Sequence, residues 1–60
     1  MTRKHFAAIA AELRRQRPDH LGLQAQATWA EIVKGMADTL AQFNSDFKRD
    51  RFLTAAGLDA

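Results

Sequence analysis

Large apolar side chains recur at helical intervals in the first third of the chain. This first stripe consists of Phe6, Ile9, Ala10 and Leu13. The spacing predicts a helix over residues 3–16, with one side turned toward a core. Thr2 is suited to cap the start of this helix, and Pro18 disfavours helical geometry at the residue before it, so we expect the helix to end there. Residues 18–22 would form the first connection.

A second and longer stripe consists of Ala25, Trp29, Ile32, Val33, Met36, Ala37, Leu40 and Phe43. It follows the helical period over about five turns and predicts a long helix whose whole stripe faces the core. The start of this helix is open, because Thr28 and Glu31 have the spacing of a capping box although residues 24–27 already favour a helix. Gly35 lies off the stripe, where it either permits close approach of another backbone or is simply tolerated.

Residues 44–46 prefer turns and should end the long helix. Phe47 is then placed to fold back onto the core. A short third helix is predicted over residues 48–56, with an inner face of Phe52, Leu53 and Ala56. Gly57 can adopt the left-handed conformation that often ends a helix, and Leu58 can make the hydrophobic contact that accompanies it.

These elements predict an all-α protein, a small three-helix bundle in one domain of residues 1–60. The long central helix would be the spine for the other two, and the C-terminal helix would be short. The chain is 47% hydrophobic, but alanine supplies 12 of its 60 residues, so the core is thin. Cysteine is absent, which excludes a disulfide. A bundle this small can hardly enclose a ligand pocket, and self-association or a partner would supplement its stability.

Positive charge is concentrated at the start of the chain. The formal net charge is only +2, yet the first 17 residues contain five cations and one acid. The outer side of the first helix is predicted to bind a partner, through Arg3, Lys4, Ala7, Ala11, Arg14 and Arg15. Alanines permit close helix approach and arginine is favoured at interfaces, although the same residues could simply be solvated.

A second basic cluster consists of Lys48, Arg49 and Arg51. These side chains could pair with Asp46 and Asp50, or they could join the first helix in one stripe that follows a phosphate backbone. Nucleic-acid binding is therefore the alternative function. Its candidate residues are Arg3, Lys4, Arg14, Arg15, Lys48, Arg49 and Arg51.

Signals for catalysis, metals or membranes are missing from the sequence. The two histidines, His5 and His20, are separated by a helix and a turn, and no cysteine could join them around a metal ion. Ser45 has no histidine nearby in sequence to activate it. We expect no enzyme activity, no cofactor, no metal, no small-molecule substrate and no membrane contact. No apolar run approaches the length of a membrane span or a signal peptide, so the cytoplasm is the expected compartment.

The order of several segments resembles a widespread group of very small proteins encoded by bacteriophages and prophages. The matching residues are Met1 to Phe6, Ile9, Ala10, Leu13, Arg17, Pro18, Trp29, Val33, Ala37, Asp38, Leu40, Asn44, Phe47, Arg51 to Leu53, Ala56 and Gly57. That family has no assigned activity, cofactor or catalytic residue, so the resemblance implies a phage or prophage source rather than a reaction. Ser45 and Lys48 depart from the family, which commonly has proline and aspartate there, and many members have a cysteine at the position of Ala56.

Taken together, these features predict a phage- or prophage-type accessory protein of the bacterial cytoplasm. It would act by binding a host or phage protein, or by self-association, with nucleic-acid binding as the alternative.

Overall fold

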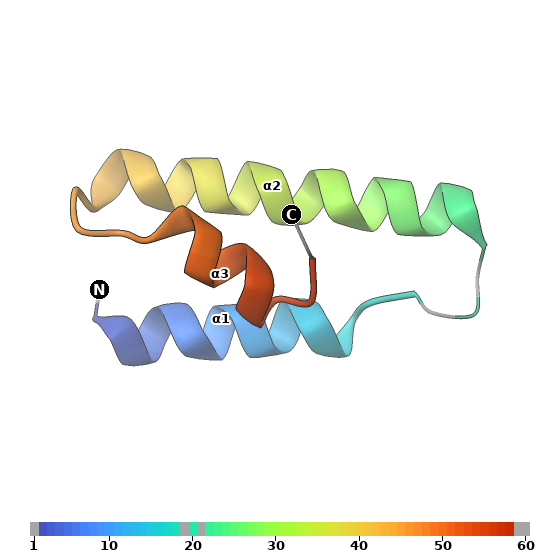
Figure 1. Ribbon diagram of the computed structural model, residues 1–60, viewed down its shortest axis with the longest axis horizontal. Helices are drawn as coiled ribbons and strands as arrows, with labels where there is room; N and C mark the ends of the chain where they lie inside the picture. The colour runs from blue at the N-terminus through green and yellow to red at the C-terminus, as the bar shows by residue number, and fades with distance from the viewer. Residues whose placement is uncertain (1, 19, 21, 59–60) are drawn as a thin grey trace.

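The computed structural model describes residues 2–18, 20 and 22–58, and within them it contains three helices and no strand (Figure 1). The helices are α1 (Arg3–Arg15), α2 (Leu23–Phe43) and α3 (Arg49–Ala55). The all-α class is confirmed, and the predicted ends of α1 and α3 are correct to within one residue. In the first connection, Asp19 and Leu21 lie outside the described residues.

The start of α2 settles the choice that the sequence left open. The helix begins at Leu23, after Gly22, so Thr28 and Glu31 lie inside it rather than at its cap. Gly22 has a φ of 92°, a backbone conformation that residues other than glycine rarely adopt. With 21 residues, α2 is about 31 Å long, which accounts for the longest dimension of the molecule, 34 Å.

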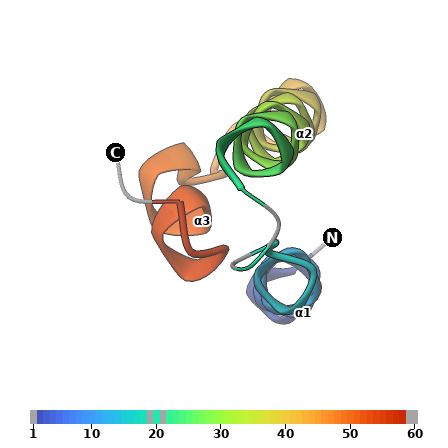
Figure 2. The same cartoon turned by 90° about the vertical axis from the view of Figure 1, so that its right-hand side faces the viewer.

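The short helix α3 holds the other two together. Figure 1 shows α1 and α2 running in opposite directions, and Figure 2 shows α3 on one side of this pair. α3 packs against both α1 and α2, which contact each other less. The prediction of a long second helix is confirmed, but its central place is borne out only in part, because α3 is the helix that packs against both of the others. Phe52 and Leu53 are both buried, and because neighbouring helical residues point about 100° apart, one short helix can contact two others.

The core is small and contains three alanines. Its buried residues are Ala10, Trp29, Val33, Ala37, Leu40, Phe52, Leu53 and Ala56. The predicted inner face of α3 is confirmed, and Phe47 does pack back against the core. At the alanine positions, small side chains let the helices approach closely.

The stripe predicted to be the inner face of α2 is only partly buried. Trp29, Val33, Ala37 and Leu40 face the core, but Ile32, Met36 and Phe43 are 56%, 38% and 78% exposed. The prediction that all of these residues face inward is wrong for the last three. The stripe is wider than the side of α2 that α1 and α3 cover, because Ile32, Met36 and Phe43 are rotated about the helix axis away from Trp29, Val33, Ala37 and Leu40.

Two side chains from outside α1 and α3 satisfy carbonyl groups at the ends of these helices. The Trp29 Nε1–H donates to the carbonyl oxygen of Leu13 at 2.8 Å, and Arg17 Nη1 donates to that of Gly57 at 2.9 Å. The Arg17 guanidinium also lies 5.7 Å from the centre of the Trp29 ring. Both bonds fix the end of a helix against a neighbouring segment.

Gly57 ends α3 as predicted. Its φ is 91°, and the N–H groups of Gly57 and Leu58 donate to the carbonyls of Thr54 and Leu53. This is the Schellman arrangement, and Leu58 packs against the core as expected.

Candidate binding surfaces

All six residues predicted to bind a partner on α1 are exposed: Arg3, Lys4, Ala7, Ala11, Arg14 and Arg15. Not all of them are available to a partner. Arg15 is held by two hydrogen bonds to Glu12, of 2.9 and 2.7 Å, on its own helix. The hydrogen bond from Arg15, together with one from Gln16, lowers the pKa of Glu12 to about 2, and the same pairing raises the pKa of Arg15.

His5 is exposed, as expected for the side of α1 that faces water. Its Nδ1 accepts a hydrogen bond of 3.0 Å from the Thr2 N–H. His5 therefore contributes to the start of α1, where Thr2 is the N-cap residue. His20 lies exposed in a turn.

The second basic cluster is divided by the fold. Arg49 donates to Asp38 of α2 at 2.9 Å, so its partner is neither Asp46 nor Asp50. Lys48 and Arg51 instead line a cleft together with Arg3 from the first turn of α1. The cluster thus meets the N-terminal end of α1 rather than Arg14 and Arg15 near its C-terminal end, and the single basic stripe that would have included all of them does not form.

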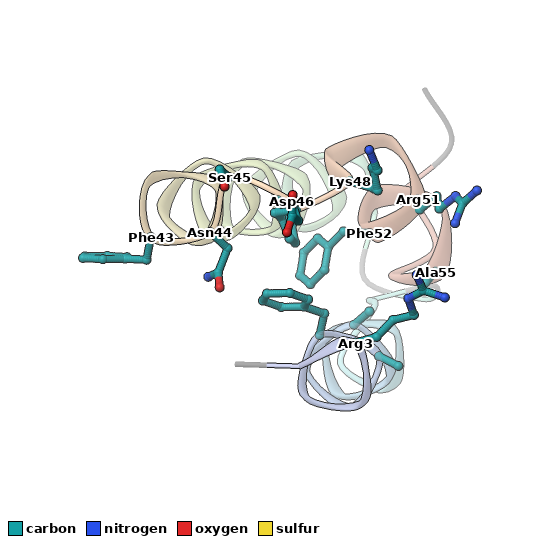
Figure 3. Close-up of a pocket in the computed structure, with 13 residues that line it drawn as sticks. Arg3, Phe43, Asn44, Ser45, Asp46, Lys48, Arg51, Phe52 and Ala55 are labelled. Carbon is teal, nitrogen blue, oxygen red and sulfur yellow. The ribbon is translucent and has the colours of Figure 1, made fainter.

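This cleft, which we call the cationic cleft, has a volume of about 520 Å³. Its lining comes from α1, the segment between α2 and α3, and α3 itself. The residues are Arg3, Phe6, Ala7, Ala10, Phe43, Asn44, Ser45, Asp46, Phe47, Lys48, Arg51, Phe52 and Ala55. Figure 3 shows Phe52 pointing into the cleft, Arg3 extending from α1 toward the part of α3 that carries Ala55, and Phe43 pointing away.

Three phenylalanines form the floor of the cationic cleft. The rings of Phe6 and Phe47 meet edge to face with centres 4.9 Å apart, and those of Phe47 and Phe52 lie 5.4 Å apart. Such contacts fix the rings against one another. The cationic cleft is an open groove rather than an enclosed cavity, so the expectation that so small a bundle can hardly enclose a ligand pocket stays a prediction.

A second surface lies on α2, and the sequence interpretation missed it. We call it the outer face of α2 and define it as Thr28, Ile32, Gly35, Met36, Thr39 and Phe43. All six residues are exposed and none is charged. The signal that could have revealed this face was the absence of Lys, Arg, Asp and Glu from one side of a long helix, since a solvated helix side normally carries charges.

Among the described residues, no three His, Asp or Glu side chains lie close enough together to hold a metal ion. Judged by length and hydropathy over the same part of the chain, none of the helices could cross a bilayer. Compared with protein-family models, curated proteins and solved structures, the chain matches none of them.

Proposed function

We propose that this chain is a non-catalytic accessory protein of the phage or prophage type that acts by binding proteins. The outer face of α2 is the observation that carries the proposal. Ile32, Met36 and Phe43 are large, apolar and exposed, and no described element covers them. Apolar surface without charges is typical of protein interfaces. The phage-type source, and with it the cytoplasm of a bacterial host, rest on the sequence resemblance.

The spacing of this face favours a second copy of the chain as its first partner. Ile32, Met36, Thr39 and Phe43 follow one another at intervals of four, three and four residues, which is the seam spacing of paired helices. A thin core also favours self-association, because a domain of this length hides only about 60% of the surface that its unfolded chain exposes.

Large and small residues alternate along the outer face of α2, so that this face can pack against the same face of a second copy. If two α2 helices pair in opposite directions about an axis between residues 35 and 36, each large residue lies opposite a small one. The facing pairs are Phe43 with Thr28, Ile32 with Thr39, and Met36 with Gly35. A two-fold interface requires this reciprocity, since each contact occurs twice.

Charge does not oppose this pairing. Glu31 and Asp38 lie at one edge of the outer face of α2, and in an antiparallel pair the same edges of both copies meet. Arg49 already pairs with Asp38 within the chain, so this edge does not bring two uncompensated acids together.

Molar mass measured by light scattering over a range of concentrations tests the proposal. The native chain should approach the mass of a dimer as concentration rises, and Ile32→Glu should remain a monomer because it buries a charge in the seam. Ala41→Glu is the matched control, since Ala41 is exposed on the opposite side of α2 and should still dimerise. A native chain that stays monomeric, or two variants that behave alike, would contradict it.

Nucleic-acid binding through phosphate contacts is the second candidate, because Arg3, Lys48 and Arg51 gather at one cleft. Two of the other candidate cations, Arg15 and Arg49, are already paired with carboxylates. This candidate predicts binding to duplex or single-stranded DNA or RNA at ~50 mM salt that weakens steeply as salt rises. The absence of binding at that salt concentration would eliminate it.

A further inference from the structure

The cationic cleft brings together three cations from separate parts of the chain. Arg3 belongs to α1, Lys48 precedes α3, and Arg51 lies within α3. None of the three side chains has an ion pair or hydrogen bond to another residue that the structure describes. Among the described residues of the lining Asp46 is the one acid, so these residues carry a net charge of +2, from three cations and one anion.

The same cleft has an apolar floor beneath these charges. Phe52 is buried, and Phe6 and Phe47 are half-buried. A ligand that matches this arrangement carries negative groups at its edges and an apolar group between them. A volume of about 520 Å³ falls within the usual range of ligand sites, about 300–1,000 Å³.

We propose that the cationic cleft binds an acidic segment of a partner protein. Carboxylates of the segment would contact Arg3, Lys48 and Arg51, and one large apolar side chain between them would pack on Phe6 and Phe47, which lie over the buried Phe52. Arginine suits this role because its guanidinium can bind a carboxylate through two parallel hydrogen bonds. The inference rests on the proposed function of protein binding, but it does not depend on the pairing of α2.

The composition of the cleft favours a peptide over a nucleic acid. Stacking of bases requires exposed aromatic faces, and here the floor rings contact one another while Phe52 is buried. The cations also gather at one cleft instead of continuing as a row along α1.

Fluorescence anisotropy with a labelled peptide tests the inference. The probe is a capped hexapeptide with two acidic residues on each side of a Leu-Phe pair. Two comparison peptides replace either all four acids by their amides or the Leu-Phe pair by Ser-Gly. The native chain should bind the probe, and each comparison peptide should bind at least about tenfold more weakly. No binding of the probe at ~50 mM salt would overturn the proposal.

Matched variants then assign the binding to the cleft. Arg51→Glu should weaken binding of the probe at least about tenfold, whereas Lys34→Glu, an equal charge change on an exposed residue outside the cleft, should alter it by less than about threefold. Helical circular dichroism verifies that both variants fold, and the comparison peptides test the native chain without any substitution. Equal losses in the two variants, or displacement of the probe by single-stranded DNA, would overturn the proposal.

One further variant tests whether peptide binding at the cationic cleft is independent of the pairing of α2. Ile32→Glu removes the dimer seam but leaves the cationic cleft intact, so it should bind the probe as the native chain does. Loss of binding in this variant would show that the cleft does not act as a separate site.

Discussion

Trp29 joins the C-terminal end of α1 to α2 through both its ring and its indole N–H. The ring is buried in the core, while Nε1 donates to the Leu13 carbonyl. That carbonyl lies in the last turn of α1, where the helix no longer supplies a backbone donor. Arg17 covers the ring from the outside.

Replacing Trp29 should therefore lower the free energy of unfolding by more than the change in side-chain size suggests. Trp29→Phe retains an aromatic ring but leaves the Leu13 carbonyl without the indole donor. We expect it to lower the free energy of unfolding by about 2 kcal/mol. Urea unfolding followed by circular dichroism measures this difference, and a variant as stable as the native chain would contradict the role given to the indole.

The pair of Glu12 and Arg15 gives a pH-dependent prediction. The pKa of Glu12 is lowered from 4.5 to about 2 in the folded chain, mainly by the hydrogen bond from Arg15. Because the folded pKa lies below the unfolded one, the pair stabilises the fold above about pH 4.5 and loses this effect as the pH falls toward 2.

A carboxyl-carbon NMR titration should show Glu12 ionising well below pH 4.5 in the native chain. In Arg15→Gln the midpoint should move back up toward that value. A Glu12 midpoint near 4.5 in the native chain would show that Glu12 and Arg15 are not paired in solution.

At the scale of elements, Gly35 inside α2 and Gly57 just after α3 have different roles. A β-carbon at Gly35 would meet nothing within 4 Å, and the residue lies inside a regular helix. Within one chain, no close backbone approach requires it. Gly57, in contrast, holds the positive φ that ends α3.

The two substitutions by alanine should have opposite effects on stability. Gly35→Ala should raise the free energy of unfolding of the dilute monomer by about 0.5–1 kcal/mol, because alanine favours a helix interior. Gly57→Ala should lower it by about 1–2 kcal/mol, because alanine disfavours the left-handed conformation. Denaturation of both variants at low protein concentration provides the comparison, and equal signs would contradict this assignment.

The sequence predicted the three helices well because the signals that start, continue and end a helix lie within a few residues of one another. The stripe of α1, the restriction before Pro18 and the glycine after α3 each act within a few residues. The width of the buried side of α2 could not be obtained in this way. It depends on where α1 and α3 lie around α2, and so Ile32, Met36 and Phe43 were assigned to the core in error.

The candidate site was predicted only in part for the same reason. Arg3, Lys48 and Arg51 were each singled out from charge, but nothing in the sequence places the first turn of α1 beside the start of α3. Arg49, next to Lys48 in the chain, points to Asp38 instead. Which cations share a cleft is decided by helix rotation and packing.

At the scale of the whole molecule, one short helix determines both surfaces. By packing against both α1 and α2 on one side of the pair, α3 completes the wall of the cationic cleft and leaves the outer face of α2 uncovered. Only Phe43 belongs to both surfaces, and its ring points away from the cleft (Figure 3). A dimer through α2 would therefore leave its two clefts open to partners, giving the assembly two binding sites for acidic segments.

Cross-linking of single cysteines tests the central claim, the antiparallel pairing of α2, most directly. The chain has no cysteine of its own, so each introduced thiol reports only its own position. Met36→Cys lies next to the proposed two-fold axis and should form a disulfide-linked dimer under mild oxidation. Thr28→Cys lies far from its own copy in this arrangement and should remain monomeric under the same conditions. Efficient cross-linking through residue 28, or none through residue 36, would contradict the account.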